Sequence, residues 1–404
     1  MERKVVIVDG IRLASGKFGG ALKDMSAADL GVPVAKELFI RNKIPFEICD
    51  ELIFGNGWQA GVGANVARQI SVRADLPDKV PAFSINKRCG SGLRAVMLAA
   101  QIIKAGDAKV IVAGGTESMS NIPYLLDKAR WGYITGNGTV IDAMIKDGFM
   151  CPLANCLMGE TAENLADKYH ISREEQDLFS LNSQKKAKKA IEEGRLKEEI
   201  LPLELISDKR KGFTTIFDTD ETPRFDTSLE RLSKLKPVFK KDGTITAGSS
   251  CTRADNASAL LIMEQKKAKD LGLEPLAIIK TYTSVGVAPE IMGIGSAEAI
   301  KSVLFKAKMS IDTIDLLEIN EAFAAQMLAA QKEIGFDLKK VNVNGGAIAF
   351  GHPVGSTGSK ILITLLYEMR RRKVQFGLVS LCIGGGQGVA MIVEQAGGKK
   401  NEHG

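Results

Sequence analysis

The two ends of the chain repeat the same order of elements: a strand, a glycine-containing loop, a helix and a second strand. The first copy has Cys89-Gly-Ser-Gly before its helix and Gly114-Gly115 after its second strand. The second copy has a loop around His352 before its helix and Cys382-Ile-Gly-Gly-Gly386 after its second strand. This repeat predicts two similar halves paired about a pseudo-twofold axis, which would bring the Cys89 and His352 loops to one seam.

Strands and helices alternate on both sides of a central region with a different texture. The expected strands cover residues 5–8, 51–54, 82–85, 110–113, 276–281, 315–319, 376–381 and 388–393. The expected helices cover residues 27–41, 64–74, 92–104, 297–308 and 322–334, and another follows the His352 loop. The alternation predicts an α/β fold with a mainly parallel sheet.

The 404 residues suit more than one α/β unit, and we expect three segments. Residues 1–120 form an N-terminal half, completed by about residues 246–272, and residues 273–404 form the C-terminal half. Residues 121–245 form an inserted cap, and we interpret its lysine-rich helix as a solvated face. Residues 394–404 are expected to be a frayed tail.

Charge and composition restrict the partners. A formal net charge of +6 and a pI near 8.8 suit an anionic ligand. Aromatic residues make up only 6% and do not alternate with basic ones, so a phosphate-bearing small molecule is expected rather than nucleic acid. No apolar run is long enough to cross a bilayer, so no membrane partner is expected. The first strand-like run begins at Val5, which leaves no room for a leader and predicts a cytoplasmic protein.

The chain has six cysteines, and their spacing predicts free thiols. A long cytoplasmic chain does not need a disulfide framework. Cys151 and Cys156 are the one close pair in the sequence, and no second pair or nearby histidine completes a zinc site. We therefore expect no metal.

Cys89 stands at a turn before a helix, beside Lys87 and Arg88. The helix dipole and the two cations would favour its thiolate, so the sequence predicts a nucleophile. The alternative is a small buried cysteine that only packs, but glycines and cations on a turn are poor surroundings for packing.

His352 lies in the segment 344–358, where five of fifteen residues are glycine. The two other histidines are His170, at an expected helix end, and His403, in the expected tail. Any imidazole base must then be His352, although a lone histidine is often structural.

Two further junctions carry residues suited to chemistry. Cys382 ends a strand before Gly384-Gly385-Gly386, whose amides would point at a developing oxyanion, and its thiol would act as an acid or base. Asn320 lies where a strand gives way to a helix, so its side chain would hold a water or an oxyanion, cap the helix, or do both.

The chain resembles the thiolases over essentially its full length. Four motifs in order carry the resemblance: Asn86-Lys-Arg-Cys89-Gly-Ser-Gly, Asn320-Glu-Ala-Phe323, Gly345 to Gly358 around His352, and Cys382-Ile-Gly-Gly-Gly386. The resemblance implies a five-layered αβαβα fold of two duplicated halves, an inserted loop domain that holds coenzyme A, and a homotetramer built from dimers.

The resemblance also implies the reaction and its catalytic residues. Cys89 would accept the acyl group, His352 would activate it, and Cys382 would move the proton at the acetyl α-carbon. Asn320, through a water, and His352 would form one oxyanion hole, and the amides of Cys89 and Gly384 the other. The substrates would be acetyl-CoA and 3-ketoacyl-CoA, with no metal or redox cofactor.

Substrate contacts are implied in the same way. Met292, Ala322 and Phe323 would line the acetyl pocket. Met158 would lie beside the pantetheine, while Arg224, Ala247 and Cys251 would contact the coenzyme or the acyl group.

Three stretches depart from the common thiolase pattern. Leu157 stands where biosynthetic thiolases often have histidine, and Cys251 stands where a serine hydroxyl is usual. Arg253 follows, either as an extra phosphate contact or as a surface residue, and Arg12-Leu-Ala-Ser replaces a common Arg-Thr-Pro. These changes bear on chain-length preference.

The leading hypothesis is an acyl-CoA C-acetyltransferase, with a 3-ketoacyl-CoA thiolase of broader chain length as the close alternative. A condensing enzyme of fatty-acid synthesis would need a second histidine to decarboxylate malonyl donors, and Asn320 occupies that place. A coenzyme A-binding subunit without turnover is the third alternative.

Overall fold

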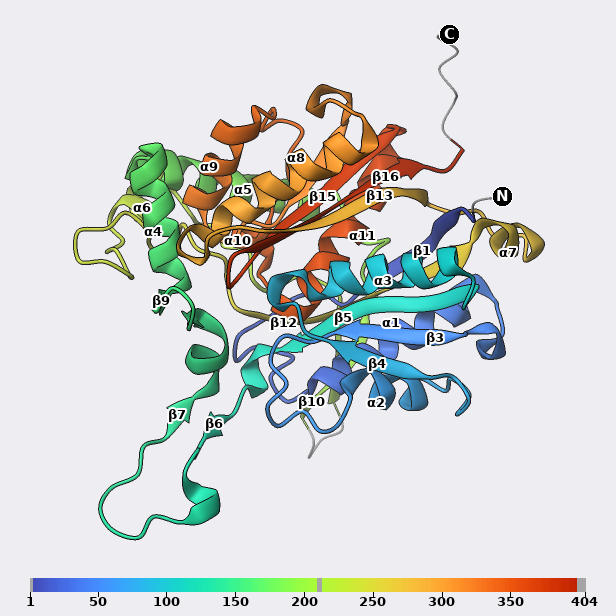
Figure 1. Cartoon of the computed structure of the whole chain (residues 1–404), viewed down its shortest axis with the longest axis horizontal. Coiled ribbons are helices and arrows are strands. Elements are labelled where there is room, and N and C mark those ends of the chain that lie inside the picture. The colour runs from blue at the N-terminus through green and yellow to red at the C-terminus, as the bar shows by residue number, and fades with distance from the viewer. Residues whose placement is uncertain (1–2, 209–212, 398–404) are drawn as a thin grey trace.

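The computed structural model describes residues 3–208 and 213–397 (Figure 1). One mixed sheet runs through the molecule in the order β14-β15-β16-β13-β1-β12-β5-β3-β4, with β2 paired to β12. Its two halves meet where Val6 and Ile7 of β1 pair with Ile278 and Ala277 of β13. The predicted tail lies largely outside the described residues, and β16 continues to Gln395.

The N-terminal half-sheet has parallel and antiparallel neighbours. Strand β3 is parallel to β4 and β5, whereas β12 is antiparallel to β5 and β1. The elements of this half are β1 (Val5–Arg12), β2 (Gly16–Lys17), α1 (Ala27–Asn42), β3 (Glu51–Gly55), α2 (Val66–Arg73), β4 (Ala82–Ile85), α3 (Ser91–Ala105), β5 (Val110–Ser118), β12 (Ala254–Glu264) and α7 (Gln265–Asp270).

The C-terminal half-sheet repeats this arrangement. Strand β14 is parallel to β15, and β16 is antiparallel to both β15 and β13. The prediction of a mainly parallel sheet was therefore wrong, because each half places long antiparallel strands beside a short parallel set. The elements are β13 (Ala277–Gly286), α8 (Gly295–Ala307), β14 (Leu316–Ile319), α9 (Ala324–Ile334), α10 (Ala347–Phe350), α11 (Val354–Arg372), β15 (Phe376–Ile383) and β16 (Gln387–Gln395).

Helices and half-sheets form five layers (Figure 1). Helices α1 and α2 cover the outer face of the N-terminal half-sheet, and α8, with α9 packed on it, covers the outer face of the other. Helices α3 and α11 pack on each other between the two half-sheets. Three large apolar clusters fill the outer, central and opposite outer interfaces. The predicted αβαβα fold is thus confirmed.

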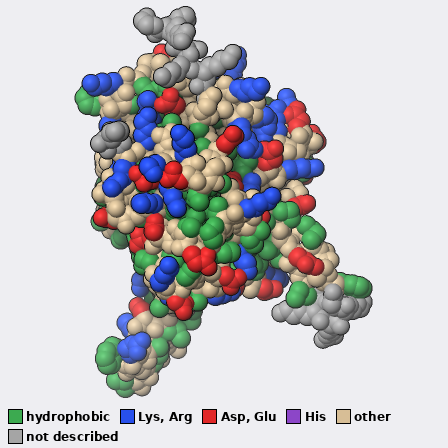
Figure 2. Space-filling model, turned by 90° about the vertical axis from the view of Figure 1, so that its right-hand side faces the viewer, with side chains coloured by type: hydrophobic (Ala, Val, Ile, Leu, Met, Phe, Trp, Pro, Cys, Tyr) green, Lys and Arg blue, Asp and Glu red, His purple; other side chains and the backbone are tan. Residues whose placement is uncertain are grey.

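Residues 119–253 connect β5 to β12, and Ala187, Ala190, Leu196, Ile200 and Phe217 of this insertion join the outer apolar cluster of the N-terminal half. The elements of this insertion are β6 (Tyr124–Leu125), β7 (Ile141–Asp142), β8 (Met150–Cys151), β9 (Cys156–Leu157), α4 (Met158–Tyr169), α5 (Arg173–Glu192), β10 (Leu203–Asp208), β11 (Phe213–Phe217) and α6 (Leu229–Ser233). The β6–β7 segment extends away from the body as an arm, which Figures 1 and 2 show from two sides. Helix α4 packs on α9 of the C-terminal half, so the insertion reaches the edge of the seam.

Candidate active site

The Cys89 turn is built to approach the other half closely. Arg88, Cys89 and Gly90 form a 3-10 turn that leads into α3, and Arg88 adopts left-handed φ of 47°. Ser91 fixes the turn, because its Oγ accepts from Lys87 N and donates to Arg88 O. A Cβ at Gly90 would lie 2.5 Å from Ile383 Cδ1, so only glycine allows this contact with β15.

Arg88 is held beside the nucleophile by the loop that follows β3. Its Nη1 donates to Gly57 O at 2.9 Å, and its guanidinium stacks 4.3 Å from the Trp58 ring centroid. The same loop is fixed by Glu117, whose buried carboxylate accepts from the amides of Gly57 and Trp58. Glu117 also accepts from Gly355 N at the start of α11, so one carboxylate joins the Cys89 and His352 sides of the site.

Burial raises the pKa of the Cys89 thiol, and the nearby positive charge of Arg88 only partly offsets this. The expected thiolate stabilisation is therefore incomplete. Lys87 does not supply it, because its Nζ donates to Gln387 Oε1 at 2.6 Å. The backbone amide of Gly384, which comes from the other half of the chain, also acts to lower the pKa of Cys89. Cys89 rests as a thiol at neutral pH and needs a base.

His352 lies between α10 and α11 and is buried. Its Nδ1 is 2.6 Å from Thr357 Oγ1, and that hydroxyl donates to Pro353 O. Because the hydroxyl proton is engaged there, the oxygen accepts from Nδ1–H and leaves Nε2 unprotonated. Burial, with the charges of Lys360 and Arg88, lowers the pKa of His352 to about 3. The imidazole is neutral, with its free nitrogen inside the site.

Asn320 follows β14 and faces His352. Its Nδ2 is 3.5 Å from His352 Nε2. Its Oδ1 is buried and has no hydrogen-bond partner among the described residues. Such an atom suits a bound water or ligand. The predicted helix cap is wrong, because α9 begins at Ala324 with Phe323 as its N-cap residue.

Three thiols lie close together. Cys382, buried at the end of β15, and Cys251 are both affected by the charge of Cys89. Burial raises the pKa of Cys251 to about 12, and that of Cys382 lies well above its usual value. Cys251 is fixed by its amide, which donates to Ala322 O at 3.0 Å, and the next residue's carbonyl accepts from His352 N.

Four apolar residues predicted as substrate contacts share one cluster with Cys382: Met158, Met292, Ala322 and Phe323. Met158 lies beside Gly384, since a Cβ added at Gly384 would stand 3.1 Å from Met158 Cε. Arg224 lies in the insertion and Ala247 lies just after it. Both side chains are exposed, and neither belongs to this apolar cluster. Arg253 is also exposed, stacked 4.0 Å from the Phe18 ring centroid.

Sequence reasoning missed Thr357, Glu117 and the Arg88–Trp58 stack. Thr357 lies in the His352 motif, five residues after the histidine, so a hydroxyl near the histidine in sequence was a usable signal. The sequence gives no signal for the role of Glu117, because the amides that it accepts from, at residues 57, 58 and 355, are distant from it in the chain. Among the described residues, no group of three His, Cys, Asp or Glu side chains is arranged to hold a metal, and no helix is long and apolar enough to span a membrane.

Two duplicated α/β halves with a cysteine turn and a histidine loop at their seam define the class of protein. The sequence matches the thiolase N-terminal domain over residues 5–266 and the thiolase C-terminal domain over residues 273–395. The chain belongs to the thiolase family, and it is a thiolase enzyme.

Relatives and solved structures match along their whole lengths. An acetyl-CoA acetyltransferase of Syntrophomonas wolfei is 51% identical over 98% of this chain and 100% of its own. The crystal structure of the Bacillus anthracis acetyl-CoA acetyltransferase superposes with a TM-score of 0.95 at 44% identity, over 98% of this chain and 99% of that one. The crystal structure of human mitochondrial 3-ketoacyl-CoA thiolase superposes with a TM-score of 0.93 at 40% identity, over 97% of this chain and 99% of that one.

Proposed function

We propose that the enzyme is an acetyl-CoA C-acetyltransferase, which condenses two acetyl-CoA molecules to acetoacetyl-CoA and catalyses the reverse thiolysis through a Cys89 acyl-enzyme. The observation that carries the proposal is the packing of the Cys89 turn against β15, which holds the buried Cys382, and against α11, which follows the buried His352. The names of the relatives described above support the substrate. A cytoplasmic location fits these soluble substrates.

The first half-reaction follows from the protonation states. His352 Nε2 takes the proton of the Cys89 thiol as the sulfur attacks the thioester carbonyl. The amides of Cys89 and Gly384 donate to the resulting oxyanion. When it collapses, the carbon–sulfur bond to coenzyme A breaks and the imidazolium returns its proton to the leaving thiolate. A low pKa for His352 favours this return.

The second half-reaction joins two carbon atoms. The thiolate form of Cys382, which its raised pKa makes scarce but strongly basic, removes a proton from the α-carbon of a second acetyl-CoA, and the carbanion attacks the acyl group on Cys89. Asn320, through a water, and His352 hold the enolate oxygen. Collapse of this intermediate releases acetoacetyl-CoA and the Cys89 thiolate, which takes its proton from Cys382.

Residues 121–245 would hold the coenzyme A. Arg224 and Ala247 have exposed side chains, which suits contact with the soluble part of the coenzyme, whereas Met158 lies at the inner end beside Gly384. Cys251 and the apolar cluster around Met292 would then surround the acyl group.

The test is CoA-dependent thiolysis of a series of 3-ketoacyl-CoA substrates of increasing chain length. A steep fall in kcat/KM beyond four acyl carbons is expected. Equal rates with long chains would favour a 3-ketoacyl-CoA thiolase of broad specificity. Binding of coenzyme A without thiolysis would favour a subunit without turnover, and reaction with malonyl donors would favour a condensing enzyme.

Replacing Thr357 by valine is expected to lower kcat for thiolysis by about 10-fold to 100-fold, because the His352 ring loses the acceptor that fixes its tautomer. The KM values should change little. Thr357→Ser keeps the hydroxyl and serves as the control. A valine variant with the kcat of the serine variant would show that Thr357 does not orient the base.

We also propose that the enzyme is a homotetramer built from dimers, and the β6–β7 arm supports this. The arm exposes large apolar side chains, with Trp131 86% and Ile134 97% exposed, and Figure 2 shows it standing clear of the body. Exposed apolar groups grouped on one projection are typical of an interface.

The double substitution Trp131→Ser and Ile134→Ser is expected to convert tetramers to dimers, measured by light scattering on a sizing column. Phe305→Ser is the control, because Phe305 is 87% exposed on α8, away from the arm. A double variant that remains tetrameric, or a control that also dissociates, would contradict the assignment of the arm.

A further inference from the structure

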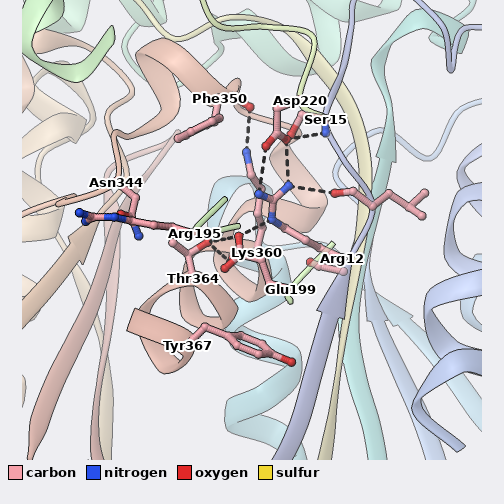
Figure 3. Close-up of polar contacts among 12 residues, drawn as sticks. Arg12, Ser15, Arg195, Glu199, Asp220, Asn344, Phe350, Lys360, Thr364 and Tyr367 are labelled. Atoms are coloured by element: carbon pink, nitrogen blue, oxygen red, sulfur yellow. Dashed lines mark hydrogen bonds and ion pairs between the residues drawn. The ribbon is translucent and has the colours of Figure 1, made fainter. Parts of the chain in front are cut away.

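A buried charged cluster lies beside Phe350, two residues before His352 (Figure 3). Its members come from three parts of the chain. Arg12 ends β1, Glu199 and Asp220 belong to the insertion, and Lys360 lies on α11. Arg12 is 1% exposed and Lys360 4%, and neither the acyl transfer nor the proton transfers proposed above use them.

Arg12 is fixed by both acidic residues. Its Nη1 and Nη2 donate to the two carboxylate oxygens of Asp220 at 2.8 and 3.0 Å, and its Nε donates to Glu199 at 2.7 Å. Thr364, one turn beyond Lys360, donates to the same Glu199 oxygen. Two cations and two anions therefore share one buried volume, and their charges balance only when Lys360 is protonated.

Lys360 points from this cluster to the backbone before His352. Its Nζ donates to Phe350 O at 2.8 Å and to Gly351 O at 3.2 Å, the two carbonyls that precede the histidine. Gly351 has a left-handed φ of 77°, so the turn depends on these contacts and not on a regular helix. The ammonium thus closes the turn that aims the His352 ring.

We propose that Lys360 is a positioning residue for the base His352: its Nζ holds the Phe350 and Gly351 carbonyls, and the buried carboxylates of Asp220 and Glu199 balance its charge and that of Arg12. The inference rests on the proposed role of His352 and adds a residue that does not touch the substrate. A misplacement of about 1 Å in a reacting group lowers rates by about 100-fold, so a loosened turn has a measurable cost.

Charge supports the same assignment. Burial lowers the pKa of Lys360 to about 8, with Asp220 and Glu199 opposing this shift and Arg12 adding to it. Glu318 lines the same small cavity of about 20 Å³, and burial beside Glu321 raises its pKa well above the usual range. The positive charge of Lys360 in turn lowers the pKa of His352. Lys360 therefore acts on both the position and the protonation of the base.

The test compares Lys360→Met, Lys360→Arg and the double variant Lys360→Met with Glu199→Gln. Wild-type thiolysis is measured first, since its absence would refute the proposed function and not this inference. Lys360→Met is expected to lower kcat by about 10-fold to 100-fold with KM within about twofold, whereas arginine, which keeps the charge and the donors, retains kcat within about threefold.

The double variant separates positioning from charge balance. It restores neutrality to the cluster but leaves the Phe350 and Gly351 carbonyls without their donor, so its kcat should stay low while its melting temperature recovers. The pH profile of Cys89 alkylation by iodoacetamide should move to lower pH in both methionine variants, because loss of the neighbouring positive charge raises the pKa of His352 and makes it a better acceptor of the Cys89 proton. Glu199→Gln alone provides the background.

Four results would overturn the inference. Recovery of kcat in the double variant would assign Lys360 to charge balance alone. An increase in KM at constant kcat, or an unchanged alkylation profile, would place its effect away from His352. Failure of both methionine variants to fold would show that Lys360 is needed for folding and not specifically for positioning His352.

Discussion

Replacing Cys89 by alanine is expected to abolish acyl-enzyme formation from acetyl-CoA and to lower thiolysis by about 10⁴-fold or more. Alanine offers no sulfur at this turn to accept an acyl group, while the packing of the turn against β15 and α11 can remain. Intact-protein mass spectrometry after incubation with acetyl-CoA measures the adduct, and a steady-state thiolysis assay measures turnover.

The neighbouring thiol provides a matched control. Cys251 lies close enough to Cys89 for the two to influence each other's ionisation, yet its amide and not its sulfur makes the contact with Ala322. Cys251→Ala should still gain one acetyl group at residue 89. An adduct on the Cys89→Ala variant would place the nucleophile on Cys251 or Cys382 and overturn the assignment.

The duplicated halves could be predicted because each copy shows the same order of strand, glycine-containing loop, helix and strand in a short stretch of sequence. Helices expected at residues 27–41 and 92–104 match α1 and α3 within two residues, since their apolar spacing decides their burial. The strand β12 was not expected as one element. It begins with Asp255, Asn256 and Ser258, types depleted in strands, and each is buried against a partner distant in sequence. That strand also makes the sheet mixed, because it runs antiparallel between β1 and β5.

Residue types at the site could be predicted, but protonation states could not. A cysteine beside two cations at a helix start suggested a thiolate, and only the fold reveals that Lys87 turns to Gln387. Desolvation then outweighs Arg88. The supports of His352 were missed for the same reason. In the sequence, nothing distinguishes Lys360 from other helix lysines, and only the fold reveals that its Nζ donates to Phe350 O.

Replacing Cys382 by serine is expected to separate the two half-reactions. Acetylation of Cys89 should continue, because the sulfur, its Gly384 donor and His352 all remain. Condensation and thiolysis should fall by about 10²-fold to 10⁴-fold, because a serine hydroxyl is a far weaker acid than a thiol and cannot shuttle the α-proton. The serine is close in size, so the buried end of β15 should keep its packing.

Hydrogen exchange at the acetyl α-carbon gives the decisive measurement. In deuterated water the wild-type enzyme should exchange the methyl protons of acetyl-CoA, while the Cys382→Ser variant should form the acetyl-enzyme and leave those protons in place. A change in acetylation alone would point instead to a role for Cys382 beside the nucleophile. If exchange persisted at the wild-type rate, the base would have to be another group, and Cys251, the other thiol whose pKa the charge of Cys89 affects, would be tested next.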